Sequence, residues 1–312
     1  RPILGGVTFA VHQGERIALV GLNGAGKTTL LRILAGQEQL ESGEIVCPKS
    51  ATIGYLPQEI LSAGNKTLFE EAQEAFSQVL ELQQRLDEAA RSLKTLDTTS
   101  DLYADTLELI GELEHALEDS EQSKLKSRIE RVLHGLGFAQ ADMQRRCDEF
   151  SGGWQMRIAL AKLLLREPSL LMLDEPTNHL DIESVVWLEQ YLKNYQGALI
   201  LVSHDRRLLD SLCTRTLALS RGNLESYAGN YSYYEQQAAA RRVQTEQAAK
   251  NQQRRIEKTE RFIERFRAKN TKAAQVQSRI KALEKIERIE VQQDEARIAF
   301  RFPPVARSGQ TV

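Results

Sequence analysis

Cysteine is scarce in this sequence, which contains three, and they stand far apart at Cys47, Cys147 and Cys213. No CxxC pair and no Cys/His spacing typical of a zinc site occurs, so a disulfide framework and a structural metal site are both excluded. The odd number of isolated cysteines indicates a chain with reduced thiols, as is usual in the cytoplasm.

Long apolar runs are missing as well. The longest, "IALVG" and "IALAKLLL", are shorter than the roughly 20 residues that cross a bilayer. The N-terminus lacks the basic and then apolar pattern of a signal peptide. The sequence therefore predicts a protein without a membrane domain. Because the chain begins with Arg1 rather than Met and ends soon after the strand-like "ARIAFRF", we expect a fragment at both ends.

Basic and acidic residues are nearly equal in number over the whole chain, but two of its segments carry a clear excess of one sign. The 312 residues carry 41 Lys and Arg against 43 Asp and Glu, and 41% of them are apolar. This length and composition predict a globular protein of about two domains. Residues 241–290 carry 15 Lys and Arg against 7 Glu, whereas residues 66–130 carry 7 against 16 Asp and Glu. The first segment is typical of one that binds a polyanion.

Short apolar strands alternate with helices in two parts of the chain, which predicts a parallel α/β sheet. Residues 67–134 and 232–290 are instead polar and helical, and each predicts a helical hairpin, the second broken near residues 268–272. A β-hairpin is expected in "TLALSRGNLESYAG", turned at Arg221-Gly222-Asn223. The expected strands are "VTFAV", "RIALVG", "EIVC", "TIGYL", "SLLMLD" and "ALILVS".

The stretch "GLNGAGKTT" at residues 21–29 fits the phosphate-binding P-loop. Glycines allow backbone N–H groups to approach phosphate oxygens, and the positive end of the following helix faces the same charge. In this pattern Lys27 reaches the β- and γ-phosphates and the Thr28 hydroxyl ligates Mg²⁺. We expect the loop to bind a nucleotide through Gly21, Asn23, Gly24, Ala25, Gly26, Lys27, Thr28 and Thr29.

Two acidic residues end the apolar strand "LLMLDEP" at residues 170–176. Beside a P-loop, Asp174 is expected to hold Mg²⁺, as the second-strand Asp does in P-loop enzymes. Glu175 is then placed to activate a water molecule. Without the P-loop, two acids capping a helix N-terminus would be the commoner interpretation.

Five motifs occur together in the order typical of ABC-type ATPases: the loop 21–29, Gln58 in "GYLPQE", "SGGWQ", "LDEPTNHLD" and "SHD" at residues 203–205. Residues 2–230 therefore resemble an ABC ATPase domain, that is, a P-loop NTPase with an α/β fold. The resemblance implies that Gln58 senses Mg²⁺ and the attacking water. It also implies that His204 contacts the γ-phosphate and that Asp181 lies at the seam between two domains.

ABC domains work in pairs, and each ATP lies between the P-loop of one domain and the signature motif of the other. The resemblance thus implies that Ser151, Gly152 and Gly153 bind the ATP of a second domain through N–H groups at a helix N-terminus. The aromatic residue that this family stacks on adenine is missing ahead of the loop. Phe9 is expected to be a core residue instead.

Three features resemble the ABC-F subfamily more than a transporter ATPase. The signature is Phe150-Ser-Gly-Gly-Trp154, a helical arm is inserted after Gln58, and "FRAKNTKAAQVQSRIKALEK" is similar to the ABC-F linker. The resemblance implies an ATP-hydrolysing cytoplasmic protein that binds the ribosome and modulates translation, with its linker contacting tRNA or rRNA. The expected domains are an ABC ATPase at 1–230 with an arm at about 67–134, a charged coiled-coil linker at 231–291, and the start of a second ABC domain at 292–312.

The residues of the linker also favour contact with RNA. Basic side chains recur at three- and four-residue steps and form a stripe on one helical face. Apolar side chains from Ile256 to Phe266 are expected to pack on a returning helix that carries Val276, Ile280, Leu283 and Ile286. A solvated helical spacer is the alternative, since runs of charge are usually solvated. The RNA-contact candidates are Arg254, Lys258, Arg261, Arg265, Arg267, Lys269, Lys272 and Arg279.

Two other functions remain open from the sequence. One is the ATPase subunit of an ABC membrane transporter, which would share the same motifs. The other is a structural coiled-coil adaptor with a vestigial nucleotide site. The intact set of Lys27, Asp174 and Glu175 opposes the second alternative.

Overall fold

The structure, a computed structural model, describes residues 4–58, 65–93, 101–119, 125–266 and 273–285. The chain divides into two compact units, Arg1–Tyr234 and Glu235–Val312. The sequence placed the corresponding boundary at residue 230. The predicted start of a second ABC domain at 292–312 lies outside the described residues.

A six-stranded sheet with the order β2-β3-β4-β1-β5-β6 forms the centre of the first unit. Five strands run parallel, and β6 pairs with β5 in the antiparallel direction. This arrangement confirms the predicted α/β fold. The strands are β1 (Arg16–Val20), β2 (Ile53–Leu56), β3 (Leu170–Asp174), β4 (Ala198–Val202), β5 (Arg215–Ser220) and β6 (Asn223–Tyr227).

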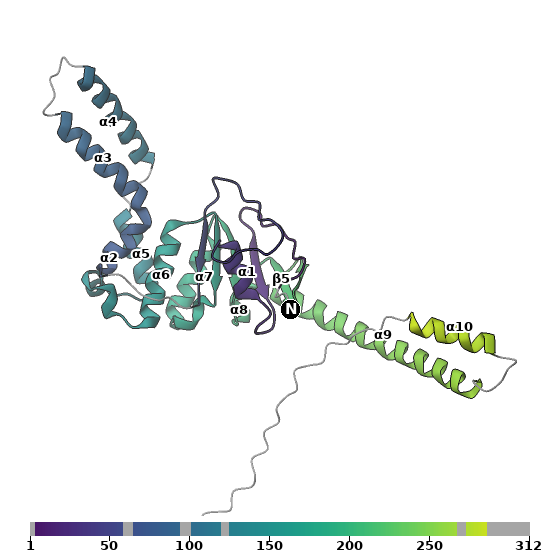
Figure 1. Cartoon of the computed structure of the whole chain (residues 1–312). Helices are drawn as coiled ribbons and strands as arrows, with labels where there is room; N and C mark the ends of the chain where they lie inside the picture. Colours follow the sequence, from purple (N-terminus) through teal and green to yellow (C-terminus); the bar gives the residue numbers. More distant parts are fainter. Residues whose placement is uncertain (1–3, 59–64, 94–100, 120–124, 267–272, 286–312) are drawn as a thin grey trace, which may run out of the picture. The chain divides into compact units, whose positions relative to one another are not determined.

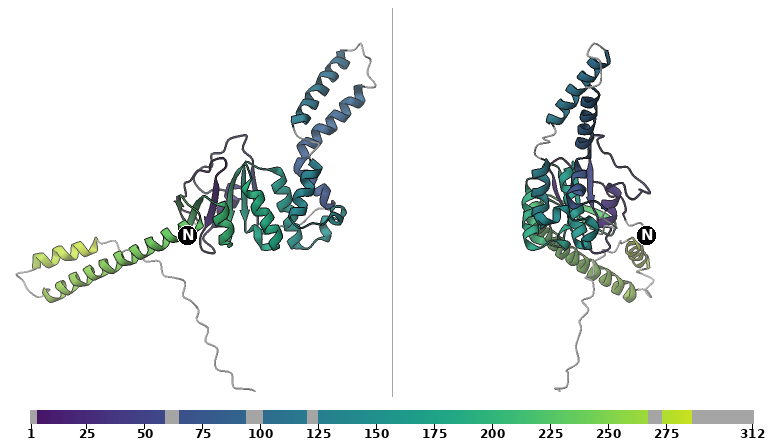
Figure 2. Two further views of the ribbon diagram at one scale, coloured as in Figure 1. Left: turned by 180° about the vertical axis from the view of Figure 1, so that it is seen from behind. Right: turned by 90° about the vertical axis from the view of Figure 1, so that its left-hand side faces the viewer.

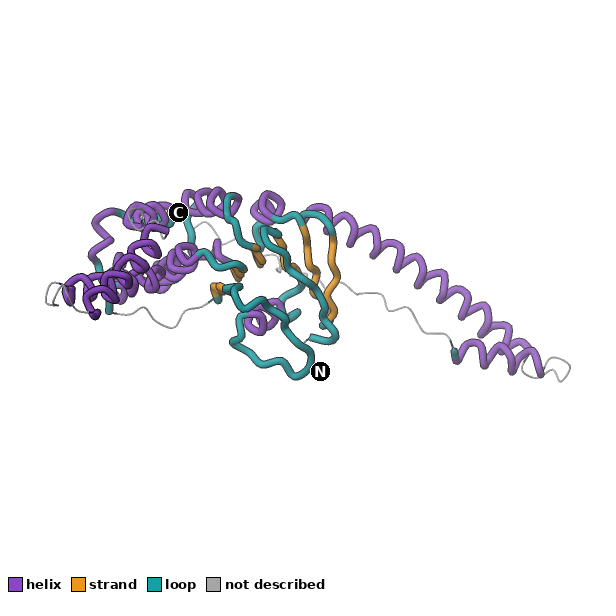
Figure 3. The backbone as a smooth tube through the Cα atoms, turned by 90° about the horizontal axis from the view of Figure 1, so that it is seen from above, coloured by secondary structure: helices purple, strands orange, loops and turns teal. Residues whose placement is uncertain are grey.

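Helices cover both faces of the sheet (Figure 3). Alternate residues of each strand point to opposite faces and therefore enter two separate cores. Ile17 and Leu19 of β1 pack with Leu30 and Leu31 of α1 (Lys27–Leu34). Ala18 and its counterparts in β3 and β4 enter the other core. That core contains residues of α5 (Leu125–Gly135), α6 (Gly152–Arg166), α7 (Ile182–Lys193) and α8 (Arg206–Leu212). Short 3₁₀ turns lie at Glu74–Phe76, Gln140–Gln144, Cys147–Glu149 and Pro176–His179.

The first and last helices of the region that follows Gln58 are packed into the core of the first unit. Leu68 of α2 (Leu68–Gln73) and Leu133 of α5 are fully buried in the same core as α6. Among the described helices between Gln58 and α6, α3 (Ser77–Leu93) and α4 (Asp101–Asp119) pair with each other and lie side by side (Figures 1 and 2). The free arm is therefore shorter than the predicted range of about 67–134, because the buried leucines tie α2 and α5 to the domain.

Two of the predicted strands do not form. Residues 7–11 and 44–47 are described, and neither segment is paired in the sheet. Val7, Phe9 and Val11 still alternate inward, half-buried against the core that contains α1, so Phe9 packs as a core residue. Alternation of side chains predicts burial, but a strand also requires a neighbour for its backbone groups.

The predicted hairpin is confirmed between β5 and β6. Ser220 and Asn223 form the last pair of the ladder. The two residues between them, Arg221 and Gly222, both have positive φ, at 50° and 81°. A two-residue connection of this kind matches the right-handed twist of the flanking strands.

The second unit contains most of α9 (Tyr231–Phe266) and all of α10 (Ala273–Glu284), which lie side by side (Figures 1 and 2). Ile256 of α9 is only 6% exposed, and the Arg279 guanidinium of α10 lies 3.7 Å from the centre of the Phe262 ring. The helical pair is as expected, and its coiled-coil packing stays a prediction. Among the residues whose structure is described, no helix combines the length and hydropathy that a membrane span requires.

Candidate nucleotide site

Four of the predicted functional segments meet at one edge of the sheet. Leu56 pairs with Leu173, and Asp174 pairs with Val202. Gln58, Glu175 and His204 therefore follow directly after the ends of three neighbouring parallel strands. The P-loop begins after Val20 of β1, the next strand in the sheet. Ligands of open α/β sheets bind at this carboxyl edge.

The P-loop has the backbone that the glycine pattern predicts. A Cβ atom at Gly21 would come within 2.4 Å of the Leu219 carbonyl oxygen, so only glycine fits at the start of the loop. Gly26 is the N-cap of α1 with φ 100°, a left-handed conformation, and it places no side chain over the first turn. The Lys27 ammonium donates to the carbonyl oxygens of Gly21 (2.8 Å) and Leu22 (3.2 Å), which folds it back along the loop.

Two of the three predicted metal ligands, Thr28 and Asp174, are brought together. The Thr28 hydroxyl donates a hydrogen bond of 2.7 Å to Oδ2 of Asp174, a residue that is only 4% exposed. Both groups offer the hard oxygen atoms that Mg²⁺ prefers. Within the described residues no group of three or more His, Cys, Asp or Glu could hold a metal. In ATPase sites Mg²⁺ is usually bound by one or two carboxylates together with phosphate oxygens and water, and Thr28 and Asp174 fit the protein's share of such a site.

Glu175 is buried at the end of β3 and is held from both sides. Its backbone N–H donates to the Val202 carbonyl oxygen at 2.9 Å. Its carboxylate oxygen Oε2 accepts a hydrogen bond of 3.1 Å from the backbone N–H of His204. The other oxygen, Oε1, lies 3.5 Å from the ring nitrogen Nε2 of His204. The His204 side chain is 75% exposed, so its ring stays available at the edge of the site. Gln58 is also exposed there.

The signature residues lie away from the P-loop of their own chain. Ser151 is the N-cap of α6, and α6 packs on the face of the sheet opposite α1. Ser151 and Gly152 are exposed, and the Ser151 side chain makes no capping hydrogen bond. The start of α6 is therefore exposed.

Asp181 has a structural role that the sequence does not indicate. It is the N-cap of α7, and its Oδ1 accepts the Ser184 N–H at 2.8 Å. Its Oδ2 accepts from Arg157 Nη1, also at 2.8 Å. The Ser184 N–H and the Arg157 guanidinium lower the pKa of this carboxyl to about 2. Arg157 was not among the predicted site residues, although an arginine within the apolar helix "MRIALAKLLL" is itself unusual.

The RNA-contact candidates are placed only in part. Arg254, Lys258, Arg261 and Arg265 are exposed on α9, as predicted. The guanidinium of Arg279 lies over the Phe262 ring, so this side chain already makes a contact within the second unit. Arg267, Lys269 and Lys272 lie outside the described residues.

Comparison with known proteins agrees with the motifs. The family described as "ABC transporter" matches residues 4–178, and a second family with the same description matches residues 217–302. The chain therefore belongs to the family of ABC-type ATPase domains, whose members bind and hydrolyse ATP.

Its curated relatives include ABC-F proteins, which confirms the predicted subfamily. ABC transporter F family member 5 of Arabidopsis thaliana is 36% identical over 99% of this chain and 45% of its own length. The probable ATP-binding protein YheS of Escherichia coli (strain K12) is 37% identical over 93% of this chain and 43% of its own length. The chain thus spans about half the length of the curated relatives it matches.

Solved structures show the same fold. The ATP-binding subunit of an ABC transporter matches with a TM-score of 0.53 and 20% identity, over 76% of this chain and 87% of that one. The RNase-L Inhibitor matches with a TM-score of 0.50 and 24% identity, over 74% of this chain and 38% of its own. These likenesses support the ABC-type α/β fold.

Proposed function

We propose that the chain binds ATP with Mg²⁺ at the carboxyl edge of its sheet and hydrolyses it together with a second ABC domain. The hydrogen bond between Thr28 and Asp174 carries this proposal, because it joins the P-loop to the acidic end of β3. Thr28, Asp174 and Gln58 would hold the ion, which when bound neutralises charge on the phosphates. Lys27 would contact the β- and γ-phosphates.

The remaining groups act on the attacking water. Glu175 is buried and fixed by the His204 N–H, so its carboxylate can orient a water molecule and accept its proton. The exposed ring of His204 would contact the γ-phosphate. Ser151, Gly152 and Gly153, at the start of α6, would bind the ATP of the second domain, with Asp181 at the seam.

We further propose that this ATP cycle controls binding to the ribosome in the cytoplasm, and that the protein modulates translation. Four exposed basic residues at positions 254, 258, 261 and 265 share one face of α9. Ile256 is buried on the opposite side of that helix, so the basic face is turned away from the apolar contact. A stripe of this kind neutralises the phosphate backbone of rRNA or tRNA by charge alone.

Co-sedimentation with ribosomes tests this function. The complete protein carrying Glu175→Gln, which should hold ATP, is sedimented with ribosomes across a salt series. Reversing Lys258 and Arg261 to Glu should weaken binding and reduce its salt slope by about one for each lost phosphate contact.

The matched control reverses Arg241 and Arg242, which are exposed on the same helix but lie off the basic face. The control should bind with nearly the slope of the parent protein. Equal slopes for all three proteins would make α9 a solvated spacer. Co-purification with a membrane fraction instead of ribosomes would favour the ATPase subunit of a transporter.

A further inference from the structure

Arg157 is a buried charge that joins three segments of the chain. It lies on α6, six positions after Ser151, and is 8% exposed. Its Nε donates to the His179 carbonyl oxygen at 2.8 Å. Its Nη1 donates to the Leu136 carbonyl oxygen at 3.0 Å and to Asp181 Oδ2 at 2.8 Å.

The surroundings are shaped for a planar guanidinium. The Arg157 guanidinium lies 4.3 Å from the centre of the Trp154 ring, on its own helix. On another side, Gly137 has φ 92°, and a Cβ atom there would come within 2.8 Å of Nη1. A lysine could not fill this space or reach three acceptors, because its ammonium is a compact point charge without a fork.

The segment held by Arg157 begins directly after Glu175. The 3₁₀ turn Pro176–His179 leads from the end of β3 to Asp181, and Arg157 contacts this segment at His179 and at Asp181. The same two segments also come close at the signature itself, because a Cβ atom on Gly153 would be 3.6 Å from His179 Nδ1. The start of α6 and the segment 176–181 are thus packed as one piece.

We propose that Arg157 is a positioning residue that fixes the signature end of α6 and the segment 176–181 in one relative orientation. Ser151 and Asp181 then face a second domain together. The inference rests on the proposed function, in which these residues meet the nucleotide of that domain. Arg157 itself contacts no nucleotide, and its effect passes through Asp181 and His179.

The test compares four single variants and one double variant of the complete protein. Arg157→Met removes the fork and keeps an apolar stem, whereas Arg157→Lys keeps the charge alone. Asp181→Asn removes the ion pair and keeps an oxygen that can still cap α7. The matched control is Lys162→Met, five positions further along α6, which removes a cation paired with Glu71 and Glu74 away from this segment.

We expect Arg157→Met to lower ATP turnover on the order of 10²-fold, the cost of a misplacement of about 1 Å, while ATP binding to the P-loop is unchanged. Arg157→Lys should not restore turnover, and Lys162→Met should leave it unchanged. In the double variant of Arg157→Met and Asp181→Asn the losses should not multiply, because both changes break the same contact. Multiplicative losses, or rescue by lysine, would overturn the proposal.

Hydrogen exchange gives a second readout that needs no turnover. Arg157→Met and Asp181→Asn should each speed exchange of residues 178–184, and Lys162→Met should not. Unchanged exchange in the first two variants would overturn the coupling. The two proposals can fail separately. If the variants exchange faster but the parent protein has no ATPase activity, the proposed function is refuted and the positioning role of Arg157 stands. If Arg157→Met does not fold, Asp181→Asn carries the test.

Discussion

Glu175 has a strained backbone and a buried carboxylate, and each of these features by itself lowers the stability of the fold. It adopts a left-handed conformation, with φ and ψ both 52°, although it is not a glycine. Such a conformation costs about 1–2 kcal/mol for an L-residue. Its side chain, which carries the carboxylate, is also only 7% exposed. The backbone hydrogen bond to Val202 and the N–H of His204 hold it in place. Strain of this kind is typical of functional sites, where the surrounding structure maintains it.

Substitution of Glu175 by Gln tests its assigned role at the residue scale. Gln keeps the size of the side chain and can still accept the His204 N–H, but it cannot accept a proton from water. We expect ATP binding to be retained and turnover to fall by about 10²–10⁴-fold, the range of general-base assistance. Nucleotide binding and phosphate release measured on one preparation provide the comparison. Equal turnover in the variant and the parent protein would remove Glu175 from the mechanism.

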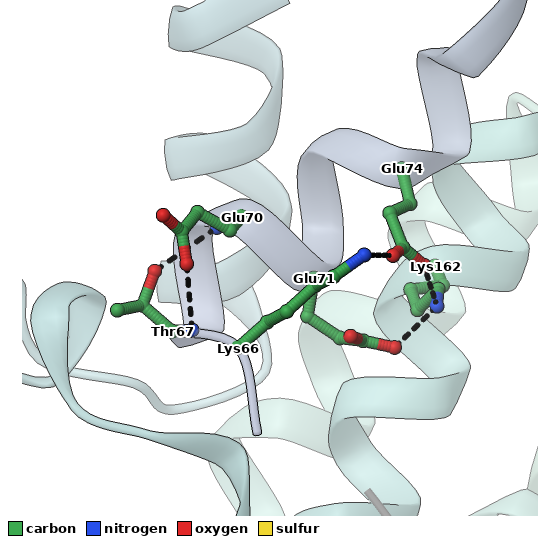
Figure 4. A network of polar contacts seen from close by, with 6 residues as sticks. All are labelled: Lys66, Thr67, Glu70, Glu71, Glu74 and Lys162. Atoms are coloured by element: carbon green, nitrogen blue, oxygen red, sulfur yellow. Dashed lines mark hydrogen bonds and ion pairs between the residues drawn. The ribbon is translucent and has the colours of Figure 1, made fainter. Parts of the chain in front are cut away.

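At the scale of elements, α6 joins the signature to the root of the helical arm. Ser151 begins the helix, Arg157 holds the segment after Glu175, and Lys162 reaches the arm side. Lys162 is paired with Glu71 of α2 and, at 2.8 Å, with Glu74 Oε2 (Figure 4). Lys66 contacts the other oxygen of Glu74. These ion pairs fasten the root of the arm to the second half of α6, away from the segment that Arg157 holds.

This network makes part of the stability pH-dependent. Hydrogen bonds from Lys162 and Lys66 lower the pKa of Glu74 from 4.5 to about 2. Since the folded-state pKa is depressed, the Glu74 carboxylate stabilises the fold above pH 4.5, and this contribution is lost as the pH falls towards about 2. Urea unfolding between pH 5 and pH 2 should thus show a shallower pH dependence for Glu74→Gln than for the parent protein.

A double variant separates the pair from general effects of acid. In a Lys162→Met background, most of the interaction is already gone, so Glu74→Gln should flatten the profile much less. If Glu74→Gln flattens the profile equally in both backgrounds, Lys162 is not the cause of the lowered pKa.

At the scale of the whole molecule, the position of the signature decides how ATP can be used. The P-loop opens into α1 on one face of the sheet, whereas α6 packs on the other. We therefore expect that a nucleotide on the P-loop does not meet Ser151 of the same domain. The proposed mechanism therefore calls for a second set of motifs, supplied by another ABC domain or by a second copy of the chain.

We expect the 312-residue chain alone to hydrolyse ATP slowly, with turnover per chain rising as protein concentration rises. The physical reason is that a complete site forms only when two domains meet. ATPase assays over a concentration series, with light scattering to follow association, provide the measurement. Fast turnover by monomers, independent of concentration, would contradict the shared site.

The sequence by itself determined the local parts of this protein. The glycines of residues 21–26 fix the P-loop, apolar runs fix the buried strands, and the pair Asp174 and Glu175 marks a strand end, because each depends on spacing along the chain. The basic face of α9 likewise follows from helical periodicity. The comparisons confirmed the ABC-type ATPase inferred from five motifs and the ABC-F resemblance inferred from the signature, the arm and the linker, while the individual site residues remain predictions.

Only the tertiary structure decided which distant residues meet. Leu68 and Leu133 bind the ends of the expected arm to the core, and no periodic pattern distinguishes them from arm leucines. Residues 7–11 and 44–47 alternate or are apolar but pair with no strand, because pairing depends on a neighbour that local pattern does not specify. Arg157 meets Leu136, His179 and Asp181 across 21–24 positions of sequence. Contacts over such separations are set by how α6 packs on the sheet, and that packing belongs to the folded chain as a whole.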